Sequence, residues 1–246
     1  MWMRSCLLAL PVVSFAAAPT DAELLKFVKD RAALERVTPK PVEMAPAVST
    51  RCSIDAVLGK SNDHRGASSH VYANEPGVLP LFDPWGKFPE GSLLLKEKLG
   101  KEDHKTELFT GMWKREAGFF PEANDWEFFT VDGAASKIVE RGKLPRCASC
   151  HEDFKKGDLV SKEYILPAQL TGGRIVLHSS QAKATGEKLH YEEEEKKNTL
   201  GYWTNPGDWA SWAFEVNRPG TYDIHVWQGC GKGSGGSEVA VITAGQ

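Results

Sequence analysis

The chain has 246 residues, a formal net charge of −3, 41% hydrophobic residues and 26% charged residues. These values are those of an ordinary globular protein, and they fit two modest domains better than one large core. Basic residues are scattered along the chain rather than gathered in a stripe, so the composition excludes the electrostatic footprint of a nucleic-acid-binding protein.

The first 18 residues have the three parts of a secretory signal peptide. Met1 to Arg4 carries the positive charge, residues 5–15 are apolar, and Ala16 to Ala18 supplies small residues for cleavage. The apolar run is shorter than the roughly 20 residues that a transmembrane helix requires, and no later stretch reaches that length. We therefore expect cleavage near Ala18 and an exported, periplasmic protein without a membrane span.

Residues 19–49 are expected to form an N-terminal helix and a linker. Apolar residues recur at helical spacing over residues 21–37, Asp21 is a suitable N-cap, and Pro39 and Pro41 end the pattern. Residues 50–91 show little periodicity and many turn-forming residues, which favours loops with short strands.

A pattern typical of antiparallel strands begins after Gly91. Alternate residues of the stretch 92–99 belong to opposite faces, with Leu93, Leu95, Glu97 and Leu99 on one and Leu94, Lys96 and Lys98 on the other. Further strands are expected over residues 107–115 and 126–132, which gives an antiparallel meander. A short helix over residues 134–141 is expected to follow this sheet.

The most specific motif of the chain is Cys147-Ala148-Ser149-Cys150-His151. Two cysteines three positions apart, followed at once by a histidine, are the attachment site of a c-type haem. Cys147 and Cys150 would each form a thioether to a haem vinyl group, and His151 would bind the iron as its proximal ligand. The sequence therefore predicts one covalent haem c.

Two other interpretations of the cysteine pair have weaker support. A structural zinc site needs four nitrogen or sulfur ligands, and the chain has no second cysteine pair. A thioredoxin-type dithiol needs a βαβ context, whereas residues 140–146 resemble a polar helix end and a turn. Of the remaining cysteines, Cys6 leaves with the signal peptide, and Cys52 and Cys230 either pair or stay as thiols.

The sequence leaves the sixth iron ligand and the distal side open. No methionine follows Cys150, which excludes a helical cytochrome with a downstream methionine ligand. The upstream candidates for a sixth ligand are Met112, His64, His70 and His104. The candidates for the distal wall are Phe119, Phe120, Phe128 and Phe129, and a carboxylate such as Glu97 or Glu116 would allow proton transfer if it points into the pocket.

Three segments, in their order along the chain, resemble the cytochrome P460 family. They are Phe88-Pro89-Glu90-Gly91-Ser92 with the five residues after it, Asn124 to Phe129, and the Cys147 to His151 motif. The resemblance covers residues 50–164 and implies a β-rich c-haem domain. The family includes enzymes that oxidise hydroxylamine and cytochromes that bind nitric oxide and similar gases at a five-coordinate iron.

The same resemblance gives Lys96 a candidate role. Lys96 falls on the family's Gly-Thr/Ser-x-x-x-Lys pattern, and catalytic members use that lysine to form an additional covalent link to the porphyrin. The alternative is an ordinary strand lysine whose ammonium reaches solvent or a haem propionate. Non-catalytic relatives keep a related sequence without the link, so both interpretations stay open.

Residues 165–246 change to a pattern of short alternating strands and turns, as in a β-sandwich. The expected strands are residues 175–178, 189–191, 212–216 and 222–227. The spacing of Trp203, Trp209, Trp212 and Tyr222 resembles the galactose-binding-like jelly-roll modules, many of which bind carbohydrate. A jelly roll needs roughly eight strands, and five or six can be counted, so the module is expected to be truncated.

Taken together, the sequence predicts a mainly β (α+β) protein, with an antiparallel-sheet c-haem domain of the cytochrome P460 type followed by an incomplete jelly-roll-like β-sandwich. The first expected function is electron transfer or the binding of a small nitrogenous ligand. The second is oxidation of hydroxylamine or nitric oxide with Lys96 joined to the porphyrin. The third is glycan binding or adhesion through the C-terminal module. The expected partners are redox proteins, a small nitrogenous ligand and carbohydrate, and the oligomeric state is left open.

Overall fold

The computed structural model describes residues 18–43, 68–100, 103–233 and 235–243. Residues 1–17 of the expected signal peptide, together with Cys6, Cys52 and His64, lie outside these described residues. The described part is mainly β, with antiparallel strand pairs and few helices. None of its helices combines the length and the apolar character needed to cross a membrane.

Seven strands form the main sheet, in the order β1-β3-β4-β5-β6-β7, with β2 also paired to β3. Their bounds are Glu35–Arg36 (β1), Val42–Glu43 (β2), Ser68–Ala73 (β3), Leu93–Leu99 (β4), Thr106–Lys114 (β5), Trp126–Asp132 (β6) and Ile138–Gly142 (β7). Every pair in this sheet is antiparallel. The expected meander is confirmed, and β6 has the bounds that the sequence predicted.

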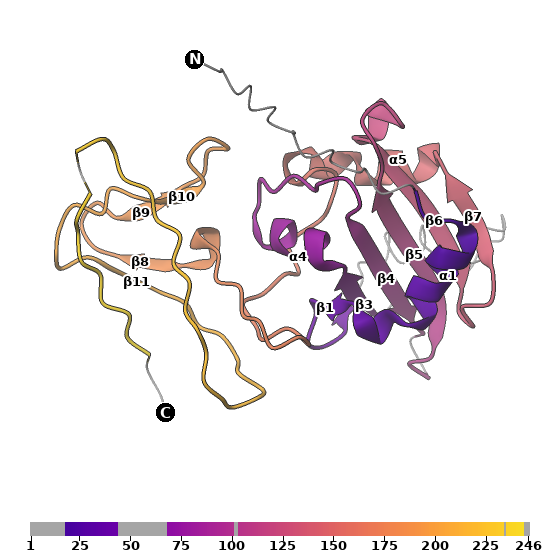
Figure 1. Cartoon of the computed structure of the whole chain (residues 1–246), viewed down its shortest axis with the longest axis horizontal. Helices are drawn as coiled ribbons and strands as arrows, with labels where there is room; N and C mark the ends of the chain where they lie inside the picture. Colours follow the sequence, from indigo (N-terminus) through magenta and orange to yellow (C-terminus); the bar gives the residue numbers. More distant parts are fainter. Residues whose placement is uncertain (1–17, 44–67, 101–102, 234, 244–246) are drawn as a thin grey trace, which may run out of the picture.

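The two faces of the main sheet carry separate hydrophobic clusters. One cluster includes Leu94, Met112 and Phe128, and it contacts Cys147 and Ala148 of helix α5 (Pro145–His151). The other includes Leu93, Leu95 and Phe129 of the sheet and Leu24 and Val28 of helix α1 (Asp21–Lys29). We call these two sides the α5 face and the α1 face (Figure 1). The alternation predicted for residues 92–99 is confirmed, because consecutive strand residues point to opposite faces.

Helix α1 begins with a capping box at Thr20, one residue before the expected cap Asp21. The amide of Glu23 donates to Thr20 Oγ1 at 3.3 Å, and the amide of Thr20 donates to Glu23 Oε2 at 2.7 Å. These reciprocal bonds satisfy two of the amides that have no partner within the helix. The prediction of Asp21 as the cap was therefore wrong by one position.

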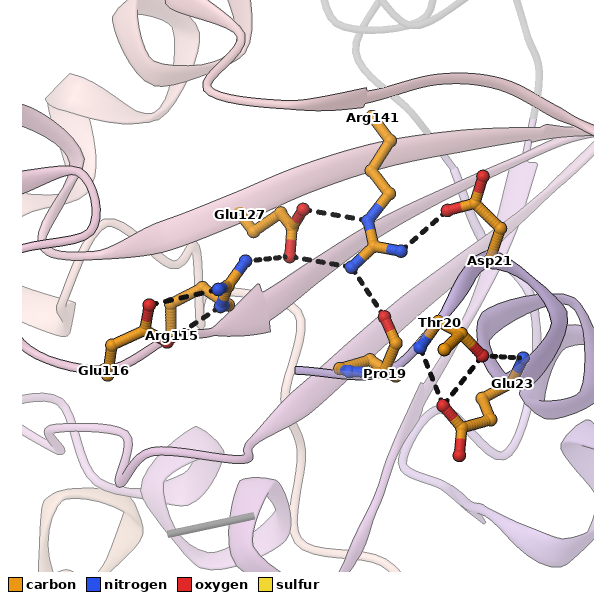
Figure 2. A network of polar contacts seen from close by, with 8 residues as sticks. All are labelled: Pro19, Thr20, Asp21, Glu23, Arg115, Glu116, Glu127 and Arg141. Carbon is orange, nitrogen blue, oxygen red and sulfur yellow. Dashed lines mark hydrogen bonds and ion pairs between the residues drawn. The ribbon is translucent and has the colours of Figure 1, made fainter. Parts of the chain in front are cut away.

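Arg141 of β7 ties the start of α1 to the sheet (Figure 2). Its guanidinium donates to Glu127 of β6 at 2.8 and 3.1 Å, to Asp21 Oδ1 at 2.7 Å and to the carbonyl of Pro19 at 2.7 Å. Arg115 donates to Glu127 from the other side at 2.9 Å. The network holds α1 over the α1 face.

The predicted helix over residues 21–37 is too long. Helix α1 ends at Lys29, a 3-10 turn occupies Arg31–Ala33, and Glu35–Arg36 pairs with β3 as β1. Leu34 is extended and 8% exposed, so it adds to the core on the α1 face. Strand pairing and burial at this point outweigh helix propensity.

A helix that the sequence pattern did not predict, α4 (Glu75–Phe82), follows β3. Turn formers such as Pro76 and Gly77 favoured loops with short strands here. Pro76 lies in the first turn, where its missing amide has no partner to lose. Val78, Leu81 and Phe82 of α4 pack into the cluster on the α5 face, and this burial stabilises a helix of weak intrinsic propensity.

The predicted helix over residues 134–141 is also wrong. Asp132 closes a tight turn instead, accepting hydrogen bonds from the amides of Ser136 at 2.6 Å and Lys137 at 3.0 Å. Ile138 then pairs with Val131 to begin β7. The β-branched residues after the turn extend the sheet rather than start a helix.

The C-terminal segment lies beside the main sheet as a separate lobe (Figure 1). Its strands are Lys183–Thr185 (β8), His190–Glu192 (β9), Thr199–Gly201 (β10) and Trp209–Ser211 (β11). They form two antiparallel pairs, β9 with β10 and β8 with β11. Only the expected strand at 189–191 overlaps one of them, through β9.

The other three strands expected in this lobe are not formed. Residues 175–178 and 212–216 make only isolated bridges, Ile175 to Gln169 and Glu215 to Ala168, and residues 222–227 are irregular. Tyr222 and Trp227 are 41% and 84% exposed. An alternating sequence needs a pairing strand and a covered face to become sheet, and the described residues supply neither here.

Candidate haem site

Helix α5 carries the Cys147 to His151 motif. Pro145 occupies its first turn, where its fixed φ angle favours a helical start. Residues three and four positions apart lie on one side of a helix, so Cys147, Cys150 and His151 share a side of α5. Both cysteines are half-buried. The structure therefore brings together the three residues that the motif predicted as a unit.

The imidazole of His151 has a fixed orientation. Its Nδ1 lies 2.7 Å from the carbonyl oxygen of Leu159. A carbonyl can only accept, so Nδ1 carries the proton and Nε2 keeps its lone pair. A histidine that binds a metal characteristically donates its other ring nitrogen to a carbonyl or carboxylate in this way. The residues present fit a proximal haem ligand that binds through Nε2.

The surroundings of His151 favour the neutral imidazole. Burial lowers the pKa of His151 to about 4, the positive charge of Lys96 acts in the same direction, and the hydrogen bond to Leu159 opposes them. The ring lies 5.5 Å from the ring of Phe128 and 6.4 Å from that of Phe154, measured between centroids. Near pH 7 the side chain is uncharged, which is the form that binds metals.

Lys96 lies on the same face of the sheet as His151. It pairs with Val71 of β3 and Thr110 of β5, one row from the pair Leu94 and Met112. Its side chain is half-buried, and its charge reaches the His151 imidazole. The two residues that the resemblance assigned to the haem are thus neighbours on the α5 face.

A polar row continues from Lys96 across the α5 face. The register places Lys96, Thr110, Thr130 and Glu140 side by side on four strands. Glu140 forms an ion pair with Arg146 of α5. This ion pair joins β7 to the helix that carries the haem motif.

The candidate distal phenylalanines are divided between the two faces. Phe128 contacts His151, whereas its neighbour Phe129 belongs to the core of the α1 face. Phe120 is buried in the cluster on the α5 face. Phe119 is half-buried against the same cluster and lies under the guanidinium of Arg115, 4.1 Å from its ring centroid. Including Phe129 among the distal candidates was wrong, because strand alternation turns it away from His151.

Neither candidate distal carboxylate faces His151. Glu97 lies on the α1 face and accepts hydrogen bonds from Arg31 at 2.7 Å, Tyr72 at 2.8 Å and Thr106 at 2.6 Å. Burial raises the pKa of Glu97, but the hydrogen bonds from these donors outweigh it, so the net pKa is lowered. Glu116 is exposed and pairs with Arg115. Both carboxylates belong to structural ion pairs.

The candidate sixth ligands are also separated. His70 pairs with Glu97 on the α1 face, so the sheet lies between it and His151. His104 is exposed in the turn beyond Leu99, and the strand from Leu94 to Leu99 spans about 17 Å at the usual rise per residue. Met112 is 7% exposed and lies on the α5 face beside Phe128. Of the described candidates, Met112 alone shares the face of His151.

The C-terminal lobe exposes several aromatic side chains. Tyr202, Trp203 and Trp209 are 54%, 48% and 51% exposed. The Tyr202 ring stacks on His190 with the centroids 5.0 Å apart. Trp212 is half-buried and donates from Nε1 to the carbonyl of His178 at 2.8 Å. Cys230 is exposed, and since Cys52 lies outside the described residues, both alternatives for these two cysteines stay open.

No protein-family model matches this chain, and no curated protein matches it either. Within the described ranges, no group of three or more His, Cys, Asp or Glu side chains gathers in a way that could hold a metal ion. A haem iron needs fewer protein ligands, because the porphyrin supplies its equatorial nitrogens. The site is therefore defined by the motif and by the geometry of His151. The residue that sequence reasoning missed is Leu159, whose backbone carbonyl carries no sequence signal.

Proposed function

We propose that this protein is an exported c-type cytochrome that holds one haem through Cys147, Cys150 and His151. The observation that carries the proposal is the hydrogen bond from His151 Nδ1 to the Leu159 carbonyl, which leaves Nε2 available to an iron. A bound haem supplies an iron that exchanges one electron or binds a small ligand. Electron transfer or the binding of a small nitrogenous ligand is the function that these residues support best.

The chain's own residues prepare this site in two ways. Burial keeps His151 neutral near pH 7, so no proton has to leave before the imidazole binds a metal. The ion pair between Arg146 and Glu140 fixes α5 against β7 and so sets the position of the two cysteines. The first feature leaves the ligand ready to bind a metal, and the second holds the motif on the α5 face.

We assign residues 50–164, which include strands β3 to β7 and helix α5, to the cytochrome P460 type of c-haem domain. Strands β1 and β2 join the same sheet from residues 35–43. The support is an antiparallel meander that precedes the haem motif, with the motif on a short helix against one sheet face. Residues 165–246 form the second unit of the proposal, an incomplete β-sandwich. The support for it is limited to two short antiparallel strand pairs, β9 with β10 and β8 with β11.

The test is haem attachment in the full-length protein, produced in a host that matures c-type cytochromes. We expect a coloured exported protein whose polypeptide mass is raised by one haem and whose N-terminus lies near Pro19. The Cys147→Ala, Cys150→Ala double variant should lose the haem, while Cys230→Ala, at an exposed cysteine, should keep it. A colourless wild-type protein at its bare peptide mass would reject the proposal.

The second candidate function is oxidation of hydroxylamine or nitric oxide with Lys96 joined to the porphyrin. The observation that favours it is the shared face of Lys96 and His151, with the lysine charge acting on the imidazole. The ferrous absorption spectrum of the holoprotein tests it. A long-wavelength band that disappears in Lys96→Arg supports this candidate. An ordinary c-haem spectrum, with Lys96 recovered unmodified by peptide mass mapping, rejects it.

The third candidate function is glycan binding by the C-terminal lobe, which the exposure of Trp203 and Trp209 favours. Aromatic rings suit sugar rings when they are open to solvent. Full-length protein on a glycan array should bind, and a variant with both tryptophans replaced by alanine should not. Trp227→Ala, at a more exposed tryptophan in an irregular segment, is the control. Absence of binding by the wild-type protein would discard this candidate.

A further inference from the structure

The carbonyl that holds His151 comes from a reversal of the chain at Asp158 and Leu159. These two residues have φ angles of 61° and 64°. This left-handed region is disfavoured for residues with a Cβ atom; aspartate enters it more readily than most of them, but leucine does not. Two such residues in succession persist only where the surrounding structure holds them.

The side chain of Asp158 is held by donors from three separate parts of the chain. Asp158 Oδ2 accepts from the amide of Phe88 at 3.0 Å and from Lys114 Nζ at 2.8 Å, and Oδ1 accepts from Asn124 Nδ2 at 2.9 Å. The side chain of Asp158 is 4% exposed. Bonds to a charged acceptor that is shielded from water are among the strongest that a protein makes.

The backbone around Asp158 is held as well. Trp126, which is 0% exposed, donates from Nε1 to the Asp158 carbonyl at 2.8 Å. The amide of Leu159 donates to the carbonyl of Phe154 at 2.9 Å, and the Leu159 side chain is 3% exposed in the cluster on the α5 face. Both polar groups of the peptide bond between Asp158 and Leu159, its carbonyl and its amide, are therefore hydrogen-bonded.

We propose that Asp158 is a positioning residue for His151. Its carboxylate holds the left-handed turn, and the turn aims the Leu159 carbonyl at His151 Nδ1. The inference rests on the proposed function, because its consequence for the protein lies at an iron bound through Nε2. A hydrogen bond on Nδ1 makes the imidazole a more basic ligand, which favours ferric over ferrous iron. Asp158 would thus help to set the reduction potential without contacting the haem.

Asp158→Asn tests this role, because it keeps the shape of the side chain and removes its charge. In the apoprotein we expect the ring proton of His151 to shift from Nδ1 toward Nε2. ¹H–¹⁵N NMR of the imidazole measures this shift. In the holoprotein we expect a higher reduction potential than in the wild type. The position of the imidazole proton and the reduction potential both depend on the hydrogen bond to the Leu159 carbonyl. A general loss of stability would change neither of them.

Glu127→Gln is the matched control. Glu127 is also a buried carboxylate between charged donors, Arg115 and Arg141, but it lies on the α1 face. We expect it to lower the melting temperature as Asp158→Asn does, and to leave the imidazole proton and the potential unchanged. Equal shifts in both variants would overturn the proposal, since they would show a general effect of losing a buried charge.

Asn124→Gly provides a milder variant should Asp158→Asn fail to fold. It removes one donor to Asp158 at a position with a φ angle of 49°, which glycine adopts without strain. We expect smaller shifts in the same directions, and unchanged readouts would overturn the proposal. The apoprotein measurement decides the role of Asp158 even if no haem is attached. Conversely, attached haem with an unshifted imidazole proton in Asp158→Asn would keep the cytochrome and reject the role of Asp158.

Discussion

The positive charge of Lys96 acts on the imidazole of His151, and both residues lie on the α5 face of the sheet. Burial is the larger cause of the lowered pKa of His151, and the charge of Lys96 adds to it. A cation beside a histidine disfavours the imidazolium form, so Lys96 helps to keep His151 neutral. The relationship links the expected proximal ligand, His151, to Lys96, for which the family resemblance implied a link to the porphyrin.

Replacing Lys96 by methionine should raise the pKa of His151 in the apoprotein, because it removes a positive charge and keeps an apolar stem. The pKa should stay below the ordinary histidine value of 6.5, since burial remains. Titration of the His151 ring protons by NMR measures this. Lys143→Met, at an exposed lysine, is the control and should leave the titration unchanged. An unaltered His151 pKa in Lys96→Met would show that the lysine charge does not reach the ring.

The stability of the apoprotein should fall as the pH is lowered from about 6.5 to about 4. The pKa of His151 is about 4 in the folded protein, against the ordinary histidine value of 6.5, so the unfolded chain takes up a proton first as the pH falls through this range. From the size of the shift, His151 accounts for roughly 3 kcal/mol of this loss. Urea unfolding at a series of pH values should show the slope in the Cys147→Ala, Cys150→Ala apoprotein. The slope should be shallower after a further His151→Gln change, and a slope of unchanged size would contradict the assignment.

Removing the carboxylate of Glu97 should destabilise the sheet. Glu97→Ala leaves Arg31, Tyr72 and Thr106 without their acceptor in a buried position, and we expect a loss of about 3 kcal/mol. Chemical denaturation of the apoprotein measures the loss. Glu194→Ala, at an exposed ion pair with Lys197, should leave the free energy of unfolding unchanged within error. If both substitutions lowered the free energy of unfolding equally, the buried position of Glu97 would add nothing to the stability of the sheet.

The strands with local signals were predictable from the sequence. β4 and β6 are rich in apolar residues, and clear turn formers stand before each of them. Their expected bounds agree with the structure to within a residue. The helix expected over residues 134–141 failed because Asp132 caps a turn there. The strands expected beyond Glu192 failed because pairing depends on partners that alternation alone does not reveal.

The candidate ligands of the site could be proposed from the sequence alone, whereas the residues around them could not be predicted. Cys147, Cys150 and His151 follow from covalent chemistry and spacing, so one local motif is enough to find them. The Leu159 acceptor depends on a left-handed turn at Asp158 and Leu159, and a leucine gives no sequence signal for that conformation. The division of Phe128 from Phe129 follows from strand alternation, once the face that carries α5 is known.

Gly111 of β5 should not tolerate a side chain. A Cβ atom there would lie 2.0 Å from Phe129 Cζ, and Phe129 is 1% exposed in the core of the α1 face, so its ring has no room to move away. Overpacking of this kind costs about 1 to 3 kcal/mol, and we expect Gly111→Ala to reach the upper part of this range. Thermal unfolding of the full-length protein measures it. Gly220→Ala is the control, because nothing lies within 4 Å of its added Cβ.

A double variant of Gly111→Ala with Phe129→Leu should recover part of the loss, since the smaller side chain frees the space that the methyl group needs. Failure to recover any of it would place the cost of Gly111→Ala in the backbone rather than in the contact with Phe129.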